Sequence, residues 1–415
     1  MPAESSPSEG ASIPPNPRSD DHASMRDQER PSADALRARS HELLMHHVGA
    51  SEAAVRTAFA SGALSLLSDH THYSNGFALL MPVAQGTAVA VRTARTSSSR
   101  AAMAGDAAAY HWSPAAPTSA EGPLWVRILA HTVNALAPGL AVDIGVASTL
   151  NDTLGDVYQA SLAVATARAV LAHRSEKKPS AGTAEVLAHL PALRQALATA
   201  TGLPFSIAFL IAAAAGGDAG PFTLVDTATH EHLPVKTAAR DTLTWMLIDP
   251  QHTPCDATFH RHRRDQADEA IALLRERAFS GLASFRELEH QNIPQAIDAL
   301  PSRLTPVVRH LVTDNRRVQR MVAAMRRSDW QMVGALLLMS HASRRTEWEC
   351  TTPEADFIVD HIEARTVDGL YGACMAGRSG YVLLVGQPHA ATLAVEPLRD
   401  AFEERFERPL PIMQL

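Results

Sequence analysis

The spacing of apolar residues along the chain predicts helices and strands in mixed order. Apolar residues between 307 and 325 recur at intervals of three and four, which predicts one long helix. Apolar runs at 77–83 and 87–92 meet at Gln85-Gly86 and predict a β-hairpin. Further helices are expected over 34–47, 51–61, 125–136, 157–172, 183–200, 266–279, 330–339, 354–363 and 395–405, and a further strand over 381–385. This mixture of strand pairs and helix pairs predicts an α+β fold.

The pattern of apolar residues indicates which part of the chain is globular and whether any part crosses a membrane. Residues 1–33 are rich in Ser, Pro, Asp and Glu and lack apolar periodicity, so we expect a disordered tail. The longest apolar stretch, 203–215, is too short to cross a bilayer. The N-terminus also lacks the basic start and apolar stretch of a signal peptide. We therefore expect no membrane association.

Composition and charge argue against several classes of protein. The 415 residues include 37 Lys and Arg against 44 Asp and Glu, a net charge of −7, which argues against nucleic-acid binding. Cys255, Cys350 and Cys374 are far apart in the sequence and odd in number, so they predict neither a disulfide framework nor a paired metal site. They indicate a reducing, cytoplasmic compartment. No metal centre is expected, since the spacing of His252, His260 and His262 is irregular.

One string of residues is distinctive. Residues 68–77 read Ser-Asp-His-Thr-His-Tyr-Ser-Asn-Gly-Phe and precede an apolar strand. The string resembles the galactokinase signature, in which Gly-Glu-His-Thr-Asp-Tyr is followed by Asn-Gly-Gly. Later segments match that family in the same order, and the resemblance covers roughly residues 40 to 415. These segments lie at 202–210, 252–264, 309–312, 316–317, 340–341, 347–354 and 369–373.

The resemblance implies the two-domain fold of the sugar, homoserine and mevalonate kinase superfamily, the GHMP kinases. In that fold ATP and substrate meet in a cleft between two α/β-sandwich domains. We place the N-terminal domain at 34–205 and the C-terminal domain at 206–415, and leave open a return of the final strand and helix to the N-terminal domain. An active member transfers a phosphoryl group from ATP to galactose.

The phosphate-binding loop of the family is altered in this chain. Its pattern, Pro-x-Gly-x-Gly-Leu-Ser-Ser-Ser, aligns with residues 151–159, where Gly155 is the one retained glycine. The serine triplet becomes Val157, Tyr158 and Gln159, which removes hydroxyls that would serve phosphate and Mg²⁺. Asp152 and Asp156 add negative charge where a helix N-terminus would otherwise attract phosphate.

The positions of the catalytic residues and of the last motif are altered as well. By the resemblance, Phe209 replaces the aspartate beside the sugar hydroxyl, and Ala63 replaces an arginine. Losing a positioned charge of this kind costs a few kcal/mol of transition-state stabilisation, about a factor of hundreds to thousands. In the last, glycine-rich motif Gly377 remains but Arg378 replaces a glycine.

The sugar-binding positions are partly retained. The resemblance gives Asp69, His70 and His72 as the residues of the signature that contact sugar hydroxyls, with Ser206 and Phe259 beside them. Phe259 replaces a tyrosine, so the pocket is expected to be more apolar than in the family. Asp69 with His70 or His72 is also a candidate acid/base pair, although a turn cap and residual fold contacts explain the same residues.

Three functions are compatible with this pattern. The first is a galactokinase-like pseudokinase that binds a sugar-like or other small metabolite and acts as a sensor or as a scaffold for a protein partner. The second is a repurposed lyase, isomerase or cyclase that uses the old cleft. The third is a divergent active galactokinase. No cofactor is expected, and ATP and Mg²⁺ are implied only if kinase activity persists.

Overall fold

The structure is a computed structural model, and it describes residues 31–50, 53–67, 69–71, 75–117, 120–175, 180–216, 221–237, 242–252 and 255–415. Most of the predicted tail and His72 lie outside the described residues. The first helix, α1, begins at Ala33, where Ser32 caps it by accepting a hydrogen bond from the Ala35 backbone N–H at 3.2 Å.

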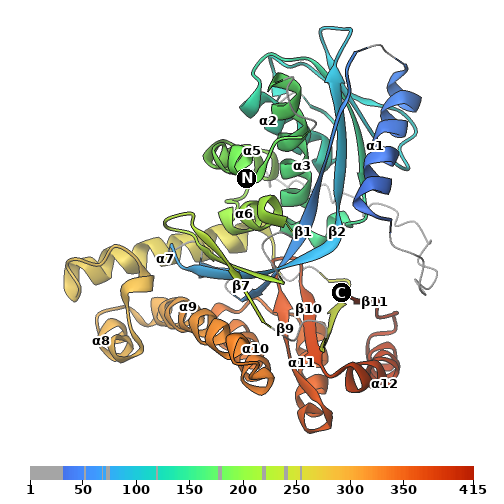
Figure 1. The fold of residues 1–415 in the computed structure, drawn as a ribbon. Helices are drawn as coiled ribbons and strands as arrows, with labels where there is room; N and C mark the ends of the chain where they lie inside the picture. The colour runs from blue at the N-terminus through green and yellow to red at the C-terminus, as the bar shows by residue number, and fades with distance from the viewer. Residues whose placement is uncertain are drawn as a thin grey trace, which may run out of the picture.

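The chain folds into an N-terminal lobe and a C-terminal lobe, which contact each other (Figure 1). The first lobe is built on a mixed sheet that runs in the order β4-β3-β5-β2-β6-β7, with β1 paired to β2. All pairs are antiparallel except β3 with β5. The strands are β1 Arg56–Leu67, β2 Phe77–Thr93, β3 Ser99–Met103, β4 Tyr110–Trp112, β5 Val142–Ser148, β6 Phe222–Asp226 and β7 His232–Val235.

Helices cover both faces of this sheet. α1 packs against β2, β3 and β5 on one face, and α3 packs against β1 and β2 on the other, where α2, α5 and α6 join it (Figure 1). The bounds are α1 Ala33–Val48, α2 Leu124–Leu136, α3 Asp156–Ser175, α4 Thr183–Leu187, α5 Leu190–Thr201 and α6 Ile207–Ala215, with a 3₁₀ turn, η3, at Asp152–Leu154. α3 is buried on almost every side. Its many small residues let the helix pack closely on the sheet.

The second lobe is built on an antiparallel sheet in the order β11-β8-β10-β9, against which α10 and α11 pack. Its strands are β8 Thr244–Ile248, β9 Leu370–Ala376, β10 Tyr381–Gly386 and β11 Ile412–Gln414. Its helices are α7 Ala257–Arg277, α8 Ile293–Asp298, α9 Thr305–Arg326, α10 Trp330–Ser343, α11 Pro353–Glu363 and α12 Pro388–Phe406. Shorter turns are η5 Phe285–Glu287, η6 His290–Asn292, η7 Ser302–Leu304, η8 Arg344–Trp348 and η9 Thr366–Asp368.

The expected hairpin and the expected helix at 51–61 are both wrong. Residues 77–93 form one continuous strand, and its main partner is β1, which occupies 56–67. Gly86 lies within β2 because β1 passes close to it: a Cβ there would lie 2.3 Å from the Ala60 carbonyl oxygen. The glycine therefore marks a close approach of two backbones rather than a turn.

Other boundaries also differ from the expected ones. The helix expected over 183–200 is two helices, which break at Ala188 and His189 before Pro191. α7 starts nine residues before the expected 266, where Asp256 accepts a hydrogen bond from the Phe259 backbone N–H. The strand expected over 381–385 is β10, which pairs with β8 and β9, and the final helix packs on β8, β10 and α11.

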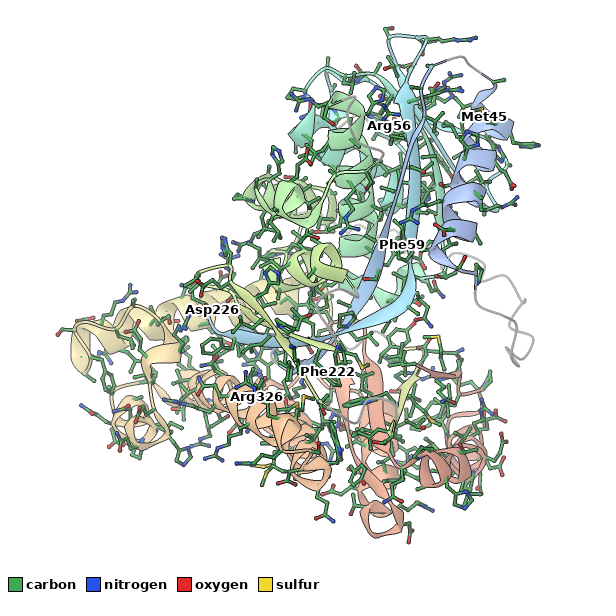
Figure 2. The ribbon with its side chains drawn as sticks, in the orientation of Figure 1. Met45, Arg56, Phe59, Phe222, Asp226 and Arg326 are labelled. Carbon is green, nitrogen blue, oxygen red and sulfur yellow. The ribbon has the colours of Figure 1, made fainter. Side chains whose placement is uncertain are left out.

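The division between the two sheets lies later than residue 205. α6, β6 and β7 belong to the first lobe, and the second sheet starts at β8. The domain boundary that we placed at 205/206 stays a prediction, but the strand pairing favours a later one. Across the junction Arg286 binds Asp226 through both guanidinium Nη atoms, at 2.7 and 2.9 Å; Asp226 is labelled in Figure 2.

Within the described residues, no helix is both long and apolar enough to span a membrane.

Gly334 offers a test of the packing of α10 on β9. A Cβ at this position would lie 1.9 Å from the Tyr371 carbonyl oxygen, which is backbone and cannot move aside easily. We expect Gly334→Ala to lower the free energy of unfolding by about 2 kcal/mol or more, although alanine favours helices. Urea denaturation measures this change.

The matched control is Gly281→Ala, an exposed position where an added Cβ meets nothing within 4 Å. It should change stability by less than about 0.5 kcal/mol. Equal stability of the two variants would contradict the close backbone packing.

Candidate functional site

Asp69 lies where the first sheet meets the second lobe. Its Oδ2 accepts a hydrogen bond from the Gly377 backbone N–H at 2.8 Å and lies 2.6 Å from Arg344 Nη2. The side chains of Asp69 and Arg344 are 1% and 0% exposed. Burial alone would lower the pKa of Arg344, but Asp69, with a smaller contribution from Asp314, raises it above its ordinary value. The carboxylate predicted to contact sugar is thus bound to the protein itself.

His70 lies at the centre of a buried group of rings. Its ring stacks on Trp348 with the centroids 4.6 Å apart, and His310 and His260 lie at 5.6 and 6.3 Å. Its Nε2 is 3.7 Å from Cys350 Sγ. The structure therefore brings both retained signature residues, Asp69 and His70, to the junction, but it buries both.

An irregular end of α10 supplies much of this environment. The helix passes into a π-helical turn at Arg344–Trp348, and the Cys350 backbone N–H closes it by donating to the Arg344 carbonyl. Glu349 follows in the left-handed conformation, with φ 57°. π-helical turns are often found at functional sites. Here the turn carries both Arg344, which pairs with Asp69, and Trp348, which stacks on His70.

Burial keeps two of the histidines neutral. His310 Nδ1 lies 2.8 Å from Ser343 Oγ, and burial lowers the pKa of His310 to about 3. Burial, with a smaller contribution from Arg378, lowers the pKa of His260 to about 4. Both ring nitrogens of His260 are buried and have no hydrogen-bond partner among the described residues. These rings can donate or accept one hydrogen bond per nitrogen without carrying charge.

The segment aligned with the phosphate-binding loop is filled by its own side chains. Gly155 adopts φ 54°, and α3 begins at the next residue. Val157 and Tyr158 are 4% and 5% exposed and belong to the core of the first lobe. The Tyr158 hydroxyl lies 4.0 Å from Met103 Sδ, and burial raises the pKa of Tyr158 above its ordinary value. Gln159 is half-buried.

An ion pair joins this segment to the altered last motif. Arg378, in the turn between β9 and β10, donates from Nε to Asp156 Oδ2 at 2.8 Å and from Nη2 to Asp156 Oδ1. Its Nη1 reaches the Pro204 carbonyl at 3.5 Å. The two side chains are 12% and 8% exposed. Nearby, the Thr153 and Tyr381 hydroxyls lie 2.7 Å apart, and this contact also connects the two lobes.

The other predicted residues lie in apolar surroundings or at helix ends. Phe209 is buried in α6 at 6.5 Å from the Phe205 ring, and Ala63 is buried in β1 opposite Pro82. Ser206 is the N-cap residue of α6. Phe259 is half-buried near the start of α7, with the Arg263 guanidinium 5.3 Å from its ring centroid.

Sequence reasoning missed Arg344, Trp348 and His310, and set His260 aside. Arg344 lies between the matched segments 340–341 and 347–354, and His310 lies in the matched segment 309–312. Neither match indicates that Arg344 reaches Asp69, which is 275 positions earlier in the chain. Only the packing of the two lobes reveals that contact.

One cavity lies elsewhere in the described part of the protein. It has a volume of about 920 Å³ beside the starts of α10 and β9, and its lining includes Trp330, Asp368, Tyr371 and Gln387. None of the predicted site residues lines it. In the described part of the chain, no three His, Cys, Asp or Glu side chains are placed to hold a metal ion.

Comparison with solved structures identifies the fold. The fold matches galactokinase from Lactococcus lactis, solved with galactose, with a TM-score of 0.78 and 17% identity, covering 91% of this chain and 96% of that one. It matches mevalonate kinase from Methanococcus jannaschii with a TM-score of 0.56 and 10% identity, over 88% and 98% of the two chains. The protein therefore has the α+β fold of the GHMP kinases, as predicted.

Comparison with known sequences identifies more specific relatives. Residues 45–93 match the galactokinase galactose-binding signature. Galactokinase from Thermotoga neapolitana is 27% identical over 277 residues, 66% of this chain and 73% of that protein. Galactokinase from Homo sapiens is 34% identical over 115 residues, 28% and 27% of the two chains. The protein is a relative of the galactokinases, which confirms the resemblance seen in the sequence.

The buried ion pair gives a stability prediction. Arg344→Leu leaves the Asp69 carboxylate buried without its guanidinium, so we expect the free energy of unfolding to fall by about 3–5 kcal/mol. The adjacent Arg345 pairs with Asp356 at 3.0 Å, but its side chain is 35% exposed. Arg345→Leu should therefore cost only about 0–1 kcal/mol. Urea denaturation of both variants tests this, and similar losses would contradict the role given to Arg344.

The buried histidines predict how stability depends on pH. Burial lowers the pKa of His310 from 6.5 to about 3, so as pH falls below 6.5 the unfolded chain binds a proton that the folded protein does not. His260 acts in the same direction. Stability should be full above about pH 6.5 and decline as pH falls toward 4.

His310→Gln should reduce this decline, because glutamine does not titrate. The control is His290→Gln, at an exposed position. Urea midpoints measured from pH 7.5 to 4.5 give the slopes. If His310→Gln and His290→Gln keep the same slope as the unaltered protein, His310 is not the group responsible.

Proposed function

We propose that this relative of the galactokinases lacks ATP-dependent sugar phosphorylation and binds a sugar-like or other small metabolite. The observation that carries the proposal is the ion pair between Asp156 and Arg378, at the start of α3. In the alignment this is the place of the phosphate-binding loop. A carboxylate there repels the phosphates of ATP, and the buried Val157 and Tyr158 take up space that a phosphate loop leaves to the ligand.

The positions aligned with the catalytic residues support the same proposal. Phe209 and Ala63 are buried apolar residues, so neither accepts a proton or stabilises developing negative charge. Phosphoryl transfer depends on held phosphates, a metal and a positive group over the transferred phosphorus. None of the side chains at the aligned positions provides these.

The ligand part of the proposal rests on the signature match at residues 45–93. Asp69 is engaged by Arg344 and Gly377, so a ligand would meet a changed set of polar groups. His70, Ser206 and Phe259 remain the predicted contacts, with His72 beyond the described residues. A protein partner and a cytoplasmic location belong to the proposal too; the latter is supported by Cys255, Cys350 and Cys374, which are free thiols.

The direct test is a phosphorylation assay with purified full-length protein, ATP, Mg²⁺ and galactose. With two positioned charges lost, we expect a rate on the order of 10⁴-fold or more below that of Thermotoga neapolitana galactokinase, assayed alongside. ADP release in a coupled assay and galactose 1-phosphate by mass spectrometry are the readouts. A rate within about 10²-fold of that of the Thermotoga neapolitana enzyme would overturn the proposal.

Ligand binding is tested by titrating the same protein with galactose and related sugars, with saturation-transfer NMR as the readout. Binding without turnover is the expected result. Phe259→Ala should weaken binding, whereas Phe279→Ala, at a half-buried position just after α7, should not. If no sugar binds at millimolar concentration, the sugar-like ligand is wrong, while the loss of kinase activity stands on its own assay.

A further inference from the structure

We propose that the cavity beside the starts of α10 and β9 binds a small organic cation, a molecule in which an ammonium group is joined to an apolar or aromatic body. The cavity has a volume of about 920 Å³, which suits a small molecule. None of the predicted site residues lines it. The inference concerns a second ligand site and does not depend on the proposed function.

The walls of the cavity come from three segments that are fixed to one another. The start of α10 packs on β9 so closely that a Cβ at Gly334 would lie 1.9 Å from the Tyr371 carbonyl oxygen (Figure 1). Gln387, which precedes α12, donates its backbone N–H to the Gly369 carbonyl at 2.9 Å. Its Nε2 lies 3.5 Å from the Tyr371 hydroxyl. These contacts hold the walls in place, so a ligand meets a preformed site.

The charged side chains that line the cavity are all negative. Asp329 and Asp368 line it, and among the described residues no Lys, Arg or His does. Arg326, labelled in Figure 2, and Arg327 precede this segment in the chain but are not part of the lining. In the described part of the chain neither carboxylate pairs with a basic side chain. A hollow lined by one sign of charge attracts ions of the opposite sign.

Aromatic rings line the same cavity. Trp330 is 9% exposed and Tyr371 is half-buried, so the core holds both rings in position. The faces of aromatic rings attract cations, and tryptophan does so most strongly. Leu338 and Leu370 add apolar surface for the body of the ligand. Hard metal ions prefer oxygen ligands alone, so these walls favour an organic cation.

Trp330 also offers a hydrogen bond. Its indole N–H has no hydrogen-bond partner within the described residues, although the N–H of a buried tryptophan usually has one. A ligand that carries a polar oxygen or nitrogen besides its ammonium group can accept this hydrogen bond. The cavity therefore combines an attraction for positive charge with a group that can orient the ligand.

The test uses two probes that share one ring and differ chiefly in charge. Full-length protein is titrated calorimetrically with benzylamine and with benzyl alcohol at neutral pH, where benzylamine is protonated. We expect benzylamine to bind about ten-fold more tightly or more, because only the ammonium group is attracted by the two carboxylates. Its affinity should fall as salt is added, since the carboxylates are close to solvent.

The variant that locates the site carries Asp329→Asn and Asp368→Asn together. These changes remove both charges and keep the size of the side chains. Asparagine caps a helix about as well as aspartate, so the cap of α10 by residue 329, at 3.1 Å from the Met332 N–H, is retained. We expect the affinity for benzylamine to fall about ten-fold, to that of benzyl alcohol, with the affinity for benzyl alcohol unchanged.

The matched control is Asp265→Asn, which removes an exposed carboxylate on α7 outside the cavity. It should bind benzylamine as the unaltered protein does. The inference is wrong if the unaltered protein binds both probes equally, or if the folded double variant binds benzylamine as tightly as Asp265→Asn. Should the double variant not fold, Asp368→Asn alone, at an exposed position, is judged by the same criteria.

The two proposals fail separately. The proposed function is decided by assays with galactose and ATP. Loss of benzylamine binding in Phe259→Ala, with binding kept in the double variant, would place the cation at the junction of the lobes and overturn the cavity site alone.

Discussion

The buried carboxylate of Asp69 connects three segments that are far apart in the chain. It follows β1 of the first sheet, pairs with Arg344 at the end of α10, and accepts the backbone N–H of Gly377 between β9 and β10. A charge this deeply buried is tolerated only with a compensating charge close by, which Arg344 supplies here. The relative position of these segments is therefore strongly constrained, and most of the junction follows from it.

The position of Arg378 is one such consequence. Because the Gly377 N–H is bound to Asp69, the next residue in the turn is directed to the start of α3, where it meets Asp156. The hydroxyl contact between Tyr381 and Thr153 lies on the same side of the junction. His70, one residue after Asp69, is likewise fixed against Trp348 from the π-helical turn.

The sequence predicted the fold class through motif order, and it predicted helices well where apolar spacing was regular, as in α9. It failed at β1, where Ala58, Ala60 and Ala63 favour a helix by themselves and only the long pairing with β2 makes them a strand. It misassigned Gly86 because a glycine needed for close strand approach looks the same in sequence as a glycine in a turn.

The candidate site was predictable in its residues but not in their partners. The alignment pointed to Asp69, His70, Asp156 and Arg378 individually. That Arg378 binds Asp156, and Arg344 binds Asp69, depends on the packing of two lobes, and no local pattern encodes it. Similarly, His260 gave no clear signal, since its burial near the His70 ring depends on the packing of segments far apart in the chain.

These internal ion pairs also limit how far a ligand can change the relative position of the two lobes. When opposite charges on two lobes meet only through a bound ligand, the ligand's binding energy holds the lobes together. Here Arg378 and Asp156 make that connection within the chain, and Arg344 and Asp69 make another. A ligand shifts a conformational equilibrium only by its difference in affinity for the two states. With the lobes already joined, the metabolite that we propose as ligand would gain little by closing them.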